Sequence, residues 1–142
     1  MLQANVAQLF EYQRERLQLL LVCGNLDAPI AINHQHASPA DLVGHLNLIH
    51  PDRIQVIGAP EINWATQQHA VRVSRHMDEI IASHPPAVIV ADGCPIPATV
   101  REACERSSTA LFSTPQAAAT VIDLLRIWLS RQLAETTELH AV

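Results

Sequence analysis

The sequence predicts an α/β fold in which a mostly parallel sheet is flanked by helices. Residues 53–58 are rich in β-branched side chains, residues 110–112 form another strand-like run, and the continuous apolar run at 87–91 is typical of a strand covered on both faces. Helical segments separate these runs, and another helical segment follows the last of them. Because alternation of strands and helices favours parallel pairing through right-handed crossovers, this order indicates helices packed on a parallel sheet.

The N-terminal part of the chain adds a helix and two further apolar runs. Residues 4–17 carry apolar side chains on one face and charged side chains on the other, as an amphipathic helix does. Residues 17–23 form a strand-like run, and residues 29–33 form a second short one. We expect irregular structure over residues 33–53, with a helical turn at 39–46.

Two helices are expected between the strands of the C-terminal part. Residues 60–84 are mostly helical in pattern, and Pro85 ends this segment. The next helix follows residues 95–97, and its inward positions are Val100, Ala103 and Cys104.

The last helix is the longest. Ser113, Thr114 and Pro115 have the chemistry of its N-cap and first turn. Residues 134–142 have turn character after it. Trp128 is expected to pack inward, whereas Trp64 fits either packing or binding. The broad apolar face of this helix consists of Val121, Leu124, Leu125, Trp128, Leu129 and Leu133.

Composition excludes several classes of protein. The 142 residues are 49% hydrophobic, which suits one domain with its own core. The net charge is −5 without a basic stripe, so phosphate contacts to nucleic acid have no electrostatic support. The apolar run at 17–23 is too short to span a bilayer, and the N-terminus lacks a signal peptide's apolar core. We expect a cytoplasmic protein with no nucleic-acid partner and no membrane partner.

Phosphate chemistry by this chain alone is disfavoured. The chain has no lysine, since all nine of its basic residues are arginine. A phosphate loop of the G-x-x-x-x-G-K-[ST] type and a lysine nucleophile are therefore excluded. Its four glycines, Gly24, Gly44, Gly58 and Gly93, are too far apart for G-x-G-x-x-G. We expect no cofactor in this chain.

His34 and His36 are the most conspicuous pair of possible metal ligands, with His45 and His50 nearby. In an extended segment the imidazoles of His34 and His36 would point to the same face. Zinc needs three or four ligands, and no cysteine is spaced to complete such a set. We therefore interpret the histidines as polar loop residues, with a metal role as the alternative.

Cys23, Cys94 and Cys104 form no C-x-x-C pair, which indicates free thiols in a reducing compartment. Cys23 and Cys104 occupy apolar positions typical of small core residues. Cys94 follows Asp92 and Gly93 at the carboxyl end of a strand, where α/β sheets bind ligands. A helix N-terminus there would lower the pKa of its thiol. The alternative, which we prefer, is a tight turn with an incidental thiol.

Three segments of the sequence resemble one family of proteins. Residues 86–112 have the family's strand, its turn with two prolines, its helix and its next strand, and residues 136–142 (TTELHAV) resemble its Thr-x-His-Gly-Val junction. The first segment, residues 39–64, carries Pro39, Leu42-Val43-Gly44-His45, His50-Pro51, Arg53-Ile54-Gln55-Val56-Ile57-Gly58, Pro60-Glu61 and Trp64. On these segments the chain resembles the N-terminal domain of the bifunctional HPr kinase/phosphorylases.

The resemblance implies a three-layer α/β/α domain similar to the N-terminal domain of the muramyl ligases, over residues 1–133. Residues 134–142 would be a junction towards an absent C-terminal kinase domain. The resemblance also implies that the whole enzyme phosphorylates HPr of the sugar phosphotransferase system on serine, with ATP or pyrophosphate, and dephosphorylates it by phosphorolysis. The absent domain would bind ATP and Mg²⁺, and the full-length enzyme would bind HPr and associate with itself as a homohexamer.

His140 matches the junction histidine that this family uses in catalysis, although Ala141 stands where the family has glycine. Phosphoryl transfer depends on a phosphate loop and Mg²⁺, so we expect this chain alone to be inactive. One alternative is a stand-alone small-ligand-binding or adaptor module of the same fold. Another is an independent metal- or thiol-dependent enzyme that uses His34, His36 or Cys94.

Overall fold

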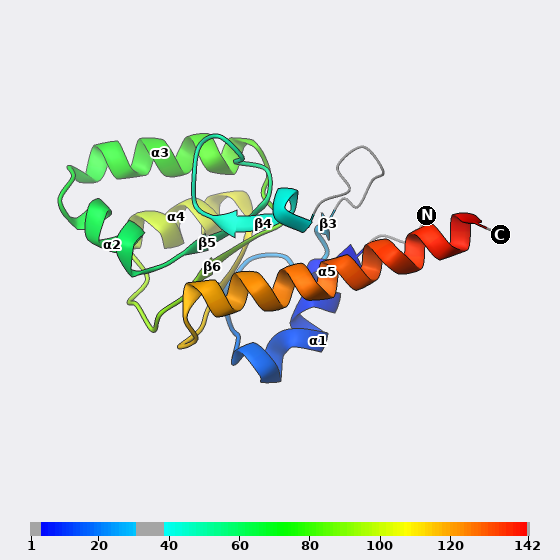
Figure 1. Ribbon diagram of the computed structural model, residues 1–142. Helices are drawn as coiled ribbons and strands as arrows, with labels where there is room; N and C mark the ends of the chain where they lie inside the picture. The colour runs from blue at the N-terminus through cyan, green and yellow to red at the C-terminus, as the bar shows by residue number, and fades with distance from the viewer. Residues whose placement is uncertain (1–3, 31–38, 142) are drawn as a thin grey trace.

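The computed structural model describes residues 4–30 and 39–141. Within these residues a five-stranded sheet runs in the order β2-β7-β6-β5-β4 (Figure 1). The parallel sheet predicted from the sequence is confirmed for β5, β6 and β7, which pair in parallel. The structure adds β4 in parallel beside β5 and β2 as an antiparallel edge beside β7. The strands are β2 (Leu20–Cys23), β4 (Val43–His45), β5 (Ile54–Ile57), β6 (Ala87–Val90) and β7 (Ala110–Ser113).

Helices cover both faces of this sheet, which confirms the expected α/β architecture (Figure 1). One face is covered by α1 (Val6–Leu17) and α5 (Ala118–Ala141). The other face is covered by α2 (Ala59–Thr66), α3 (Ala70–Ala82) and α4 (Ala98–Ser107). In the described part of the chain, no helix combines the length and hydrophobicity that crossing a membrane requires.

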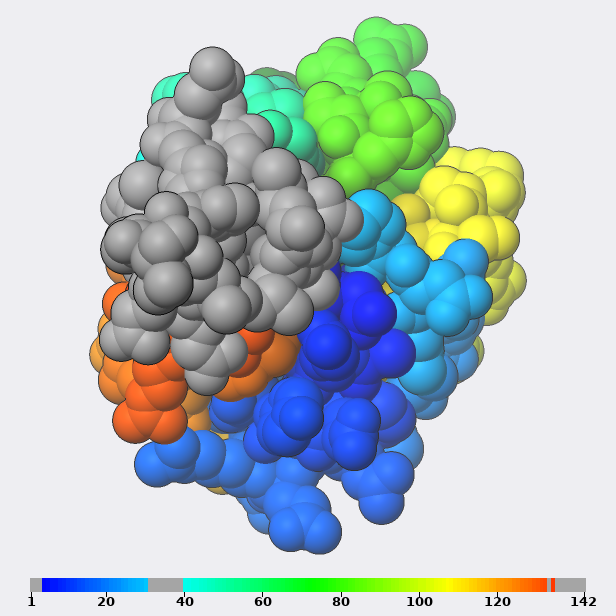
Figure 2. Space-filling view, turned by 90° about the vertical axis from the view of Figure 1, so that its right-hand side faces the viewer, coloured from blue at the N-terminus to red at the C-terminus, as the bar shows by residue number. Residues whose placement is uncertain are grey.

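The N-terminal segment closes one end of the molecule. β1 (Ala4–Asn5) pairs antiparallel with β3 (Pro29–Ile30), so the strand β1 occupies the first two residues of the predicted helix. The side chain of Asn5 then caps α1 by accepting a hydrogen bond from the Gln8 amide at 2.8 Å. Figure 2 shows this blue segment between α5 in orange and α4 in yellow.

The central strands form because their side chains are buried on both sides. All four residues of β6 are buried, as the continuous apolar run predicted, and all four of β5 are buried as well, the polar Gln55 among them. Val88, Val90 and Leu111 face α3 and α4, whereas Val56, Ile89 and Phe112 face α1 and α5. Alternate residues of each strand therefore join different cores.

The helical turn predicted at 39–46 is wrong for most of that range. A short 3₁₀ turn, η2 (Pro39–Asp41), leads into β4, which pairs in parallel with β5 through three residues. Arg53 supports this edge strand, since its guanidinium donates to the carbonyl oxygens of Ala40 at 3.2 Å and His45 at 3.0 Å. A side chain at Gly44 would meet that guanidinium, with 2.4 Å between a Cβ and Arg53 Cζ.

The predicted start of the last helix is also wrong. Ser113 belongs to β7, and α5 begins at Ala118. The hydroxyl of Thr114 is buried and donates to the carbonyl oxygen of Leu17 at the end of α1, so it does not cap α5. The helix between β5 and β6 likewise divides into α2 and α3.

The turn predicted after residue 134 is replaced by helix, because α5 continues to Ala141. The helix crosses the expected domain limit between residues 133 and 134. That limit stays a prediction.

Candidate functional site at the carboxyl edge of the sheet

Asp92 follows β6 and joins the starts of two helices. Its Oδ2 accepts a hydrogen bond from the Ala59 amide at 2.7 Å, and its Oδ1 accepts one from the Ala118 amide at 2.9 Å. Ala59 and Ala118 are the first residues of α2 and α5, where backbone amides have no partner within the helix. One carboxylate therefore neutralises the positive ends of two helix dipoles.

The backbone around Asp92 is shaped for this contact. Asp92 has φ +60° and Gly93 has φ +64°, so both lie in the left-handed region of a tight turn. Gly58 gives the carboxylate access, because a Cβ at this position would lie 2.7 Å from Asp92 Oδ2. The preferred interpretation of residues 92–95 as a tight turn is consistent with this geometry.

The helix N-termini at this edge are unfavourable for a phosphate group. Helix N-termini at the carboxyl edge are where α/β folds commonly bind phosphate groups. Here the amides of Ala59 and Ala118 already bond to Asp92. A phosphate at this place would meet that negative charge, and the chain has no lysine to balance it.

The cysteines are poorly suited to nucleophilic chemistry. Burial raises the pKa of the Cys94 thiol, and the nearby carboxylates of Asp92 and Glu61 raise it further. The lowered pKa suggested for Cys94 is therefore wrong. Cys104 is fully buried, as expected, and burial raises the pKa of its thiol to about 12. Cys23 is half-buried against the same core, so its interpretation as a core residue holds only in part.

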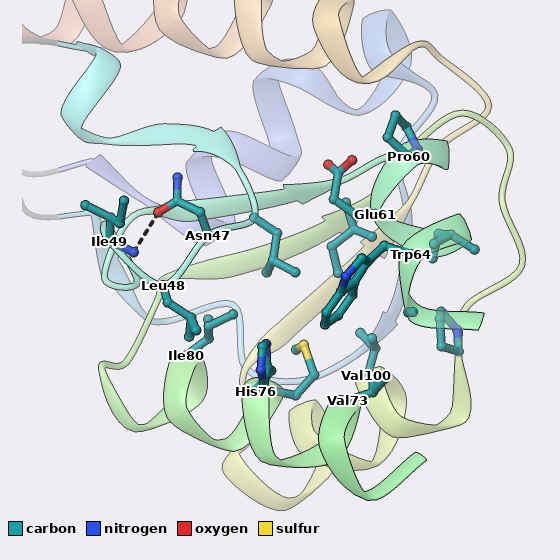
Figure 3. Close-up of a pocket in the computed structure, with 16 residues that line it drawn as sticks. Asn47, Leu48, Ile49, Pro60, Glu61, Trp64, Val73, His76, Ile80 and Val100 are labelled. Atoms are coloured by element: carbon teal, nitrogen blue, oxygen red, sulfur yellow. Dashed lines mark hydrogen bonds between the residues drawn. The ribbon is translucent and has the colours of Figure 1, made fainter. Parts of the chain in front are cut away.

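A pocket of about 540 Å³ opens between the carboxyl ends of β4 and β5 and the helices of one face (Figure 3). We call it the α2–α3 pocket. Its wall includes Ile57 of β5, Trp64 of α2, Met77 of α3 and Val100 of α4. The volume and the predominantly apolar wall are typical of small-molecule sites.

Helix α2 borders this pocket without filling it. None of its eight residues, all of them described, is buried, although Ile62, Trp64 and Ala65 are apolar. Trp64 is 41% exposed, and its ring centre lies 5.4 Å from that of His76 on α3. Figure 3 shows both rings at the pocket. Trp64 therefore borders a cavity, whereas Trp128 is buried, as the sequence predicted.

The loop after β4 forms another side of the pocket and is fixed by amide side chains. The buried Gln55 donates through Nε2 to the His50 carbonyl at 2.8 Å. Asn47 Oδ1 accepts from the Ile49 amide at 2.8 Å (Figure 3). Within this fixed loop Leu48 is 43% exposed and Ile49 is 82% exposed, so apolar side chains are displayed at the pocket.

Glu61 is the acidic group of the pocket wall. Its Oε1 accepts from the Gly58 amide at 3.2 Å and lies 3.3 Å from His45 Nδ1. The start of α2 and the imidazole of His45 thus both engage this carboxylate.

The histidine metal site, the alternative to polar loop residues, finds no support in the part that the structure describes. His34 and His36 lie outside the described residues, and His45 contacts Glu61. Among residues 4–30 and 39–141, no three His, Cys, Asp or Glu side chains come together as metal ligands. The interpretation of His34 and His36 as polar loop residues stays a prediction, with a metal role as its alternative.

His140 lies in the last turn of α5, and its catalytic role also stays a prediction. Sequence reasoning missed the α2–α3 pocket. The available signals were Trp64, which fits two interpretations, and the apolar Leu48 and Ile49 in a segment expected to be a loop.

Comparison with known proteins decides the family. A family model described as "HPr Serine kinase N terminus" matches residues 4–129. The chain belongs to this family. The resemblance found in the sequence is thereby confirmed.

Curated HPr kinase/phosphorylases agree with this family. The protein of Azoarcus sp. (strain BH72) is 53% identical over 142 residues, which cover all of this chain and 45% of that protein. The protein of Aromatoleum aromaticum is 51% identical over the same coverage. That of Paraburkholderia xenovorans is 55% identical over 105 residues, or 74% of this chain and 33% of that protein. The chain spans less than half the length of these relatives.

Proposed function

We propose that the chain is a non-catalytic N-terminal domain, regulatory or structural, of an HPr kinase/phosphorylase. The family match over residues 4–129 supports this assignment. The observation that carries the non-catalytic part is the position of Asp92, whose carboxylate holds the amides of Ala59 and Ala118. The helix N-termini that could receive a phosphate are engaged by the chain itself.

In this proposal the chemistry belongs to the rest of the enzyme. The whole protein phosphorylates a serine of HPr with ATP or pyrophosphate and removes that phosphate by phosphorolysis in the cytoplasm. ATP and Mg²⁺ bind to a catalytic domain outside these 142 residues, and that domain assembles the homohexamer. His140, at the C-terminal end of α5, would act only together with that domain.

The test is an activity assay of the purified chain in both directions. The chain is incubated with HPr, Mg²⁺ and labelled ATP, and separately with serine-phosphorylated HPr and inorganic phosphate. The Azoarcus relative at full length serves as the positive control. We expect no turnover by the chain. Turnover that survives further purification refutes the proposal, and its loss in His140→Ala would assign it to that histidine.

A second candidate function is a stand-alone small-ligand-binding or adaptor module of the same fold. The α2–α3 pocket favours it, because α2 leaves apolar side chains unburied around about 540 Å³ of space. The genomic reading frame distinguishes the two candidates. Continuation after Val142 into a glycine-rich segment that ends in Gly-Lys-Ser supports the enzyme domain, whereas a stop codon supports the module.

A further inference from the structure

We propose that the α2–α3 pocket binds an apolar monocarboxylate, with the hydrocarbon part inside the pocket and the carboxylate beside Arg72 at its mouth. This site belongs to the chain itself. The inference therefore does not depend on whether the chain works with a kinase domain.

The inside of the pocket calls for an apolar ligand. Ile57, Val73 and Met77 supply aliphatic or thioether surface, and the indole of Trp64 supplies aromatic surface. Transfer of a hydrocarbon group from water to such a wall is favourable in proportion to the area covered. Because α2 has no buried residue, a ligand here would cover surface that the chain leaves uncovered.

Hydrogen bonds within the chain fix two walls of the pocket. The Gln55 and Asn47 side chains hold the loop that carries Leu48 and Ile49. The Glu61 side chain fixes the start of α2 through the Gly58 amide. A ligand therefore need not order these two walls, which lowers the cost of binding.

Positive charge lies beside the pocket, in a neighbouring hollow that shares His76 with it. Arg72 on α3 lies over the Trp64 ring, with 5.8 Å between its Cζ and the ring centre. Its Nη1 donates to the neutral Gln68 at 3.1 Å. Arg72, Arg75, His69 and His76 border one shallow hollow, together with Glu79, and His76 also lines the pocket.

These arginines are unlike others on the same face. Arg106 binds Asp78 at 2.9 Å, and Arg101 lies 3.7 Å from Glu105. Across the described residues, neither Arg72 nor Arg75 has a carboxylate within 4.0 Å. Two arginines against Glu79 leave the hollow with a local excess of one positive charge, in a chain of net charge −5. It complements an anionic head group.

A carboxylate is the head group that fits best. The planar guanidinium of Arg72 can donate two parallel hydrogen bonds to the two oxygens of a carboxylate. A cationic head group would have to bind Glu61, the acidic residue of the pocket wall. The Glu61 carboxylate already contacts the Gly58 amide and His45. Charge thus selects the anion over the cation.

The experiment compares three probes with the same ten-carbon chain: decanoate, decanol and decylammonium. Each is titrated into the full chain below its aggregation concentration, and binding is followed by Trp64 fluorescence and by calorimetry. Trp128 is only 8% exposed and packs on the other face of the sheet, so it serves as a constant background. We expect saturable one-to-one binding of decanoate, with a Kd about tenfold lower than that of decanol.

Matched variants separate the head group from the pocket. Arg72→Gln should raise the Kd of decanoate about tenfold, to that of decanol. Arg101→Gln, an exposed arginine on α4, should leave it unchanged. Ala65→Trp should block all three probes by filling the pocket. If thermal melting shows that Ala65→Trp does not fold, Trp64→Leu replaces it and binding is followed by calorimetry. Trp64→Leu should weaken the binding of all three probes.

Several outcomes would overturn the proposal. Failure of all three probes to saturate removes the pocket as a ligand site. Equal affinity for decanoate and decanol, or no effect of Arg72→Gln on the Kd of decanoate, would show that the pocket does not recognise the carboxylate. Tightest binding of decylammonium assigns the head group to Glu61 instead. If Trp64 fluorescence changes with protein concentration in the absence of any probe, a second copy of the chain occupies the pocket instead.

Discussion

The two faces of the sheet use their apolar residues differently. On one face, α5 buries Val121, Leu125 and Leu129 completely, and they join a core with Leu9 and Leu17 of α1. On the other face, α3 and α4 bury Met77 and Val100, whereas α2 has no buried residue and only its Ile62 packs, partly buried, against this core. A long helix that lies along the sheet can close a core. The short α2, held at its start by Asp92 and Glu61, leaves a pocket beside itself.

The largest contrast should appear when one apolar side chain is shortened on each face. Leu125→Ala should lower the free energy of unfolding by about 3 kcal/mol, because it opens a cavity in a closed core. Ile62→Ala on α2 should cost less than about 1 kcal/mol, because its side chain is already next to open space. Urea denaturation of both variants measures the difference, and equal losses would show that the faces are equally closed.

The shared cap of α2 and α5 should give the next largest effect. Asp92→Asn replaces one of two acceptor oxygens by a donor that faces a backbone amide, so the free energy of unfolding should fall by about 2 kcal/mol. The matched control is Asp78→Asn, which removes only an exposed contact with Arg106 and should cost less than about 0.5 kcal/mol. If thermal melting shows the same small change for both, the double cap contributes nothing to stability.

The central sheet could be predicted from the sequence because its signals are local. β6 is a continuous apolar run, β5 is rich in β-branched residues, and every residue in both strands is buried. β4 was missed because it is a three-residue edge strand that contains Gly44, and its support comes from Arg53. The start of α5 was mispredicted for the same reason, because its support is distant in sequence. The amide of its first residue bonds to a carboxylate 26 positions earlier in the chain.

The pocket could not be predicted because it depends on how far α2 stands from its neighbours. In the sequence Trp64 fits packing as well as binding, and the placement of α2 against α3 shows that Ile62 and Trp64 border a cavity. Asp92 had a local signal, its place at a strand end, but the two amides that it binds are distant in sequence.

Gly58 should be coupled to Asp92. Gly58→Ala should lower the free energy of unfolding by about 1 kcal/mol, because its new Cβ would meet the Asp92 carboxylate. In an Asp92→Ala background the same substitution should cost less, since that carboxylate is absent. A double-mutant cycle measures the coupling. Purely additive losses would mean that the glycine is not needed for the approach of Asp92.

Thiol labelling should distinguish the buried cysteine from the half-buried ones. At pH 8 Cys104 stays protonated, because burial raises its pKa to about 12, so iodoacetamide should modify it only when the chain unfolds. Cys23 and Cys94 should react in the native state, more slowly than a free thiol because the pKa of each is raised. Mass spectrometry of peptides identifies each site, and rapid native labelling of Cys104 would contradict the closed core around it.

Amide hydrogen exchange tests most directly the claim that one face is closed and the other is left open for a ligand. Amides of residues 121–129 in α5 should exchange only with global unfolding, whereas those of residues 62–66 in α2 should be protected at least about 100-fold less. Saturating decanoate should slow exchange in α2 and leave α5 unchanged. Equal protection of the two helices, without any response of α2 to the probe, would contradict the account.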